Sequence, residues 1–196
     1  MKLFVITSRI PYPLDKGDKL RIYHQLKELS KYHKIYLCSI KSPINKEQIL
    51  CKEVLNEFCE EVYFVKQSLL LTIFSILKSF FNGLPFQTAI FTEFRAKKRV
   101  NDIIDKIKPD HIYCQLTRAA EYVKYRKETK TIDYMDVFSK GMERRAFKSN
   151  MFIKWFFRWE SLKQKNYEKS IFELFNSHTI ISEEDKKYIK HPNKDK

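Results

Sequence analysis

The sequence predicts an α/β domain built on a doubly wound parallel sheet, with three layers in the order α/β/α. Short apolar segments rich in β-branched residues alternate along the chain with helical patterns of ten or more residues. Strands separated by such helices pair in parallel. The 196 residues, of which 43% are hydrophobic, are also enough to fill the core of one ordinary domain.

The chain opens on a predicted buried strand. Residues 3–6 form an apolar run without polar alternation, as expected of a central strand covered on both faces. Pro11 and Pro13 then stiffen a loop, and Gly17 allows backbone angles or a close ligand approach that a side chain would forbid. We expect Asp18 to cap the helix that follows. The start of this helix should meet the carboxyl edge of the sheet, where α/β domains bind anions and other ligands.

The same pattern continues to the end of the chain. It predicts five further strands, over residues 34–40, 61–65, 110–115, 131–135 and 178–181. Helices are expected over residues 45–58, 94–107, 117–127 and 139–175, the last interrupted near Ser149 and Asn150. An apolar stretch from Ser68 to Phe81 spans about fourteen residues, fewer than the roughly twenty that cross a membrane.

The composition narrows the class of protein. The four cysteines form no C-x-x-C pair, which argues against a disulfide framework or a zinc site and favours a reducing, cytoplasmic location. We expect buried, inert thiols at Cys38 and Cys114. The amino terminus runs straight into a short strand and shows no signal peptide. No motif of a dehydrogenase, nucleotide hydrolase, zinc protease or α/β-hydrolase occurs, and no cofactor is expected.

The chain is strongly basic. It carries 38 Lys and Arg against 24 Asp and Glu, a net charge of +14 that attracts anionic surfaces. No DNA- or RNA-binding motif accompanies this charge, so we expect no nucleic acid partner. The basic and aromatic segment from Arg144 to Arg158 is compatible with peripheral contact to the inner face of a cytoplasmic membrane. The alternative is that its aromatic residues pack the helix onto the sheet or onto a second domain.

One segment carries a family resemblance. The run from Arg9 to Arg21, RIPYPLDKGDKLR, resembles the amino terminus of GT-B-fold sugar transferases, in particular the exopolysaccharide and PEP-CTERM-associated group of glycosyltransferase family 4. In that group a P-Y-P-x-x-K-G-D-x-x-R pattern follows the first strand. The resemblance continues in order through residues 83–86, 110–115 and 132–139, and then from residue 159 to residue 184.

The resemblance implies a fold, an activity and partners. The fold is the Rossmann-like amino-terminal half of a GT-B enzyme. The activity is transfer of a sugar from a nucleotide-diphosphate sugar to a glycan or lipid-linked acceptor during surface polysaccharide synthesis. We expect residues 1–189 to form the acceptor-side domain and residues 190–196 to be a linker or truncated end. Because the donor binds mostly to a carboxyl-terminal domain in this family, the fragment alone is expected to be inactive.

Two groups of site residues follow. Lys16, Gly17 and Asp18, with Arg21 one turn later and Arg9 at the end of the first strand, are predicted to bind substrate. A backbone amide and a guanidinium can grip a diphosphate or a hydroxyl; the alternative is a helix cap with a solvated arginine.

The second group is the segment Asp133-Tyr134-Met135-Asp136 with Ser139, at the end of the fifth strand. A carboxylate there can orient or deprotonate an acceptor, and Asp136 is the predicted catalytic residue. The family often places a histidine near this point and this chain has none, so helix capping and acceptor binding by Asp136 remain alternatives.

One family signature is matched only by spacing. An E-x₇-E pattern belongs to the carboxyl-terminal domain of the family, and Glu160 with Glu168 reproduces it here. So do Glu53 and Glu61, which indicates accidental spacing. The alternative to an enzyme is a stand-alone Rossmann-like binding or regulatory module for phosphorylated or lipid ligands.

Overall fold

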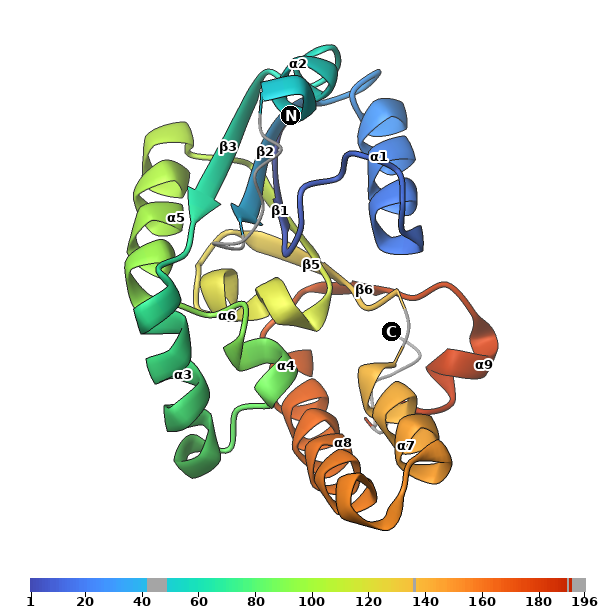
Figure 1. The fold of residues 1–196 in the computed structure, drawn as a ribbon. Coiled ribbons are helices and arrows are strands. Elements are labelled where there is room, and N and C mark those ends of the chain that lie inside the picture. The colour runs from blue at the N-terminus through green and yellow to red at the C-terminus, as the bar shows by residue number, and fades with distance from the viewer. Residues whose placement is uncertain (42–48, 136, 190, 192–196) are drawn as a thin grey trace.

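The computed structural model describes residues 1–41, 49–135, 137–189 and 191 (Figure 1). Among these residues six strands form one parallel sheet in the order β3-β2-β1-β4-β5-β6. The strands are β1 (Lys2–Thr7), β2 (Lys34–Lys41), β3 (Glu61–Lys66), β4 (His111–Gln115), β5 (Thr129–Asp133) and β6 (Ser177–Thr179). This is the strand order of a doubly wound, Rossmann-like fold, so the predicted fold class is confirmed.

The central strand divides the core in two. Leu3 and Val5 of β1 pack with residues of α1 (Gly17–Leu29) and α2 (Ile49–Asn56) on one face of the sheet. Phe4 and Ile6 point to the other face. There they pack with residues of α5 (Phe94–Ile107), the short helices η1 (Thr117–Ala119) and α6 (Ala120–Val123), and the end of α8 (Met151–Phe172). A strand buried on both faces explains why the first apolar run shows no alternation.

The remaining helices lie near or beyond the carboxyl ends of the strands (Figure 1). They are α3 (Leu69–Asn82), α4 (Phe86–Ala89), α7 (Phe138–Lys148) and α9 (Glu183–Lys186). The predicted interruption of the long helical region is confirmed, because α7 and α8 are separate helices. Asn150 caps α8, its Oδ1 accepting a hydrogen bond of 3.2 Å from the amide of Ile153. None of the described helices is long and apolar enough to cross a membrane.

Several boundaries differ from the prediction. The fifth strand was expected over residues 131–135 but ends at Asp133, because Met135 adopts a left-handed φ of 59° that no strand can continue through. The helix expected over residues 117–127 is only η1 followed by α6. The helix expected over residues 45–58 is observed from Ile49 to Asn56, and residues 45–48 lie outside the described chain.

Candidate functional site

The first candidate site lies where the sheet reverses its strand order. From β1 the chain winds outward through β2 and β3, then crosses to β4 and continues to β6, so the switch point lies between β1 and β4. Ligands of open α/β sheets bind outside the carboxyl ends of the strands at this point. Helix α1 begins there, and Nε2 of Gln115, the last residue of β4, donates to the carbonyl of Asp18 over 2.8 Å. The predicted substrate-binding loop is therefore anchored at the switch point.

Arg21 and Asp133 connect the two predicted groups of site residues. The Arg21 Nη2 atom lies 3.1 Å from Oδ2 of Asp133, whose side chain has no exposed surface. The same oxygen accepts a 2.8 Å hydrogen bond from the hydroxyl of Tyr113, and Oδ1 accepts one of 3.0 Å from the amide of Met135. A buried carboxylate with three donors is well compensated. The end of β5 and the first turns of α1 thus share one charged contact.

Tyr113 is held in its protonated, donating form. Burial raises the pKa of its hydroxyl above the usual range, and the Asp133 carboxylate raises it further. Both effects disfavour a phenolate, because burial removes hydration and a second negative charge would stand beside the first. The hydroxyl therefore serves as a permanent donor to Asp133.

Arg9 and Asp18 form a second ion pair at this edge. Arg9 Nη1 donates to Asp18 Oδ2 over 2.9 Å, and both side chains retain some exposure, 35% and 14%. Asp18 does not cap α1 as predicted. It is the second residue of the helix, Lys16 occupies the cap position, and the other Asp18 oxygen accepts a 3.1 Å bond from the amide of Lys19. The carboxylate in the first turn still complements the positive helix end.

Gly17 is the exposed first residue of α1 and needs no special backbone conformation. Its φ lies outside the left-handed region, and a Cβ added there would meet no atom within 4 Å. The expectation of backbone angles that only glycine adopts is therefore wrong. What remains is open space beside the amides of the first helical turn. Lys16 is also exposed, and its neighbour Asp15 pairs with Lys19 at 2.7 Å.

The ends of β4 and β5 share an unusual backbone feature. Leu116 and Met135, which follow these strands, both have positive φ, 67° and 59°. Such angles are uncommon for residues with side chains and concentrate at functional sites. The amide of Leu116 donates to the carbonyl of Asp133 over 2.8 Å, which ties the two strand ends together. Asp136, the predicted catalytic residue, lies outside the described residues.

Glu160 and Glu168, the pair with E-x₇-E spacing, both cap helices. The Glu160 carboxylate is buried and accepts bonds of 3.0 and 2.9 Å from the amides of Phe86 and Gln87, at the start of α4. Glu168 accepts bonds of 3.2 and 2.7 Å from the amide and hydroxyl of Ser139, at the start of α7. Amides at a helix start lack partners within the helix. Both carboxylates therefore have a structural role, since they bind groups at the starts of α4 and α7.

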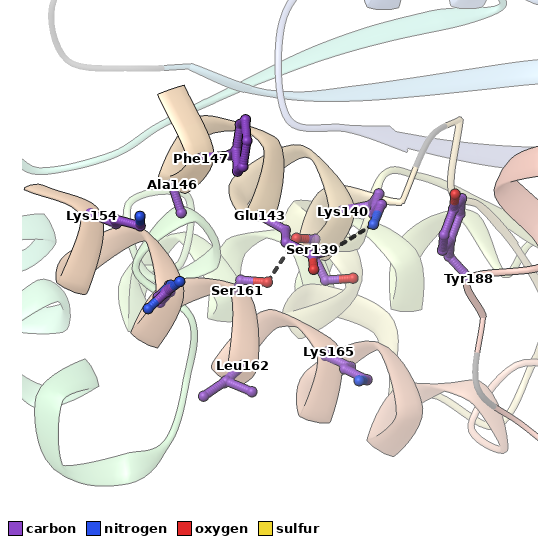
Figure 2. Close-up of a pocket in the computed structure, with 11 residues that line it drawn as sticks. Ser139, Lys140, Glu143, Ala146, Phe147, Lys154, Ser161, Leu162, Lys165 and Tyr188 are labelled. Carbon is purple, nitrogen blue, oxygen red and sulfur yellow. Dashed lines mark hydrogen bonds and ion pairs between the residues drawn. The ribbon is translucent and has the colours of Figure 1, made fainter. Parts of the chain in front are cut away.

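A pocket of about 550 Å³ lies between α7 and α8 (Figure 2). Its cations come mostly from one stripe of α8, Lys154, Arg158 and Lys165, with Lys140 added from α7. Lys140 pairs with Glu143 at 2.7 Å, and its hydrogen bond is the main reason that the pKa of the Glu143 carboxyl is lowered. The other lining residues are Ser139, Ala146, Phe147, Ser161, Leu162 and Tyr188.

The pocket combines a cationic rim with apolar and hydroxyl groups. Such a lining fits an anionic or amphiphilic ligand. The segment from Arg144 to Arg158 was expected to contact a membrane or to pack onto the sheet or a second domain, and this pocket was not predicted. The spacing of residues 154, 158 and 165, in steps of four and seven, is the signal that could have placed three cations on one helical face. The contribution of α7 depends on how the two helices pack.

The four thiols are all buried. Cys38 in β2 and Cys114 in β4 have no exposed surface, as expected, and Cys51 and Cys59 are also buried. Burial raises the pKa of both Cys38 and Cys59 to about 12. Within the described part of the chain, no cluster of three or more His, Cys, Asp or Glu side chains could hold a metal ion.

The sequence was compared with models of protein families and with curated proteins. No family model and no curated protein matches the chain.

Proposed function

We propose that the chain is the amino-terminal, acceptor-side domain of a sugar transferase with a GT-B fold. It would take part in moving a sugar from a nucleotide-diphosphate sugar to a glycan or lipid-linked acceptor. The observation that carries the proposal is the contact between Arg21 and Asp133. These residues belong to the two segments, 9–21 and 132–139, in which the resemblance expects substrate contacts. Their meeting at the switch point supports one shared site.

The proposed roles follow from the chemistry of each group. Lys16 is exposed at the positive end of α1, and a Cβ at Gly17 would meet no atom within 4 Å, an arrangement that suits the phosphates of a donor. Arg9 and Arg21 are each oriented by a carboxylate. A guanidinium carries five N–H donors, so an arginine held by one carboxylate keeps donors for an acceptor hydroxyl or phosphate. Asp136 is proposed to orient or deprotonate the acceptor.

The test uses the full-length protein that contains this domain. It is incubated with a panel of nucleotide-diphosphate sugars and a lipid extract of the source cells, and release of nucleoside diphosphate and transfer of labelled sugar are measured. Gly17→Val is the diagnostic variant, because a Cβ at this position would meet no protein atom within 4 Å and the added methyl groups would extend into the proposed ligand space. We expect transfer to fall at least about tenfold.

Gly141→Ala is the matched control. Gly141 lies in α7, and a Cβ there also meets no atom within 4 Å, so this variant should keep full activity. Unchanged transfer by Gly17→Val, or no transfer from any donor by the full-length protein, would contradict the proposal.

A second candidate function is favoured by the pocket of Figure 2. Its four cations and apolar lining suit a phosphorylated or lipid ligand that is bound and not turned over. Calorimetric titration of the chain with glycerol phosphate tests this reading. Binding that is lost in an Arg158→Ala, Lys165→Ala double variant, together with no sugar transfer by the full-length protein, would favour a binding module over the enzyme.

A further inference from the structure

Helix α3 is inverted: small polar side chains are buried, and most of its large apolar side chains are exposed. Its buried residues are Thr72 and Ser79, whereas its leucines and phenylalanines point mostly to solvent. The buried hydroxyls are satisfied within the helix, since Thr72 donates to the carbonyl of Ser68 over 2.9 Å and Ser79 to that of Ile76 over 2.6 Å. A surface helix of a globular protein normally has the opposite arrangement. The exposed large residues are Leu69, Leu70, Ile73, Phe74, Leu77, Phe80 and Phe81.

An aromatic ladder joins this face to α8. Phe80 stacks on Trp159 with ring centres 5.5 Å apart, and Trp159 stacks on Trp155 at 6.4 Å. Trp155 is 71% exposed, and Met151 one turn earlier is 84% exposed. We call the exposed α3 residues together with Met151, Trp155 and Trp159 the aromatic surface. Figure 1 shows α3 and α8 extending to the same side, away from β1 and β2.

The two chain segments that form the aromatic surface carry positive charge only. Residues 69–92 contain one charged side chain, Lys78, and residues 144–159 contain five Lys and Arg and no acidic residue. The five are Arg144, Arg145, Lys148, Lys154 and Arg158. Glu160, the next acidic residue along α8, is buried against the start of α4.

Together, the positive charge and the aromatic residues indicate which kind of partner covers the aromatic surface. Large exposed apolar patches mark interaction sites. A second copy of the chain would bring two sets of like charges together, which disfavours association of this face with itself. Tryptophan beside Lys and Arg suits the boundary between lipid headgroups and acyl chains, and cations beside it attract anionic lipids. At 14 residues α3 is too short to span a bilayer, but it has the length and pattern of a helix that lies in the interface.

We propose that the aromatic surface docks the protein on an anionic lipid bilayer. Leucine and phenylalanine side chains of α3 enter the headgroup boundary, Trp155 lies at its level, and the surrounding Lys and Arg side chains contact lipid phosphates. The proposal goes beyond sugar transfer and does not depend on it, because binding to vesicles requires neither donor nor acceptor.

Vesicle flotation of the chain tests the proposal. Vesicles of phosphatidylcholine alone are compared with vesicles that also contain phosphatidylglycerol, and we expect binding to the second kind, weakened by added salt. A Leu70→Ser, Phe74→Ser double variant should lower the partition coefficient at least about tenfold, since two large apolar side chains no longer leave water. Tyr32→Ser is the control, because Tyr32 is 78% exposed and lies between α1 and β2.

Charge and fluorescence provide two further measurements. Lys154→Glu should weaken binding roughly fivefold or more, whereas Lys52→Glu, on an exposed position of α2, should leave it nearly unchanged. The chain has two tryptophans, Trp155 and Trp159, and both belong to the aromatic surface. Their emission should therefore shift to shorter wavelength on binding and be quenched by brominated lipids.

Two results would overturn the proposal. One is no partition of the folded protein into anionic vesicles, with tryptophan emission unchanged. The other is a dimer in solution that the Leu70→Ser, Phe74→Ser variant dissociates, which would assign the face to a second copy. Loss of sugar transfer with vesicle binding retained would count against the proposed enzyme alone.

Discussion

The side chains of Arg21 and Asp133 bring the first helix and the fifth strand together at the carboxyl edge of the sheet. Their closest atoms are 3.1 Å apart, and the carboxylate is completely buried while the guanidinium is 23% exposed. Removing one partner of such an ion pair destabilises the fold more than removing one partner of a surface pair, because the remaining charge is left inside the protein.

Loss of the Arg21 side chain should therefore destabilise the domain. Arg21→Ala leaves Asp133 with Tyr113 and the Met135 amide as donors but without a countercharge. We expect the free energy of unfolding in urea to fall by about 3 kcal/mol. Arg9→Ala is the control, because Arg9 and its partner Asp18 are partly exposed and the loss should be about 1 kcal/mol or less. Equal losses in the two variants would contradict this account.

The two buried glutamates should contribute to stability by capping. Glu160→Ala removes the acceptor of two amides at the start of α4, and we expect unfolding to become easier by about 1–3 kcal/mol. Glu53→Ala offers a matched comparison, because Glu53 belongs to the other pair with the same spacing and is exposed on α2. Its effect in thermal or urea unfolding should be negligible. A large loss from Glu53→Ala would show that burial is not the deciding factor.

Stability should decrease as the solution becomes mildly acidic. The pKa of His178 is lowered, first by burial and then by the nearby His191, so the folded state favours the neutral ring. The unfolded chain takes up a proton below a pH of about 6.5, and stability is lost from there down to the lower pKa of the folded state. The melting temperature should fall accordingly between neutral and mildly acidic pH.

His178→Phe should reduce that fall. The variant keeps a ring against Phe172, whose centre is 3.8 Å from that of His178, and removes the titrating group. Part of the dependence should remain, because burial lowers the pKa of His111 as well. His24→Gln, on an exposed position of α1, provides the control. A pH dependence unchanged by His178→Phe would exclude His178 as a source.

The native thiols should be unreactive. All four cysteines are buried, and burial raises the pKa of Cys38 and Cys59 to about 12, so almost no thiolate is present near neutral pH. Iodoacetamide should label none of them in the folded protein and all four after unfolding in urea, as measured by mass spectrometry. Rapid labelling of one cysteine in the native state would reveal local opening around it.

The fold was predictable because its signals are local. The pattern over residues 94–107 predicts the observed bounds of α5, and Asn150 marks the start of α8 both in the sequence and in its hydrogen bond to Ile153. The prediction for β5 failed because Tyr134 and Met135 continue the apolar pattern, whereas the φ of Met135 ends the strand. A backbone angle of this kind leaves no trace in residue type unless glycine occupies the position.

The candidate site was predictable only in part. The sequence predicted that Lys16, Gly17, Asp18 and Arg21 lie at the carboxyl edge of the sheet, but it did not predict the partner of each charge. Asp133 and Asp18 accept the two arginines because of how α1 packs over the sheet, which is a relationship between distant segments. The orientation of α3 was equally hidden, because the almost continuous apolar stretch from Ser68 to Phe81 does not show which of its sides is buried.

Because α3 is inverted, its large apolar side chains do not stabilise the fold as those of most amphipathic helices do. In an ordinary amphipathic helix the apolar face packs into the core and stabilises the fold, so only substitutions that preserve folding are tolerated there. Here the inward face consists of small hydroxyl residues such as Thr72 and Ser79, and the large side chains are not part of either core. Substitutions on the outward face can therefore accumulate with little effect on folding. Natural variation at Leu70, Phe74 and Leu77 would be free to follow the demands of whatever the helix contacts.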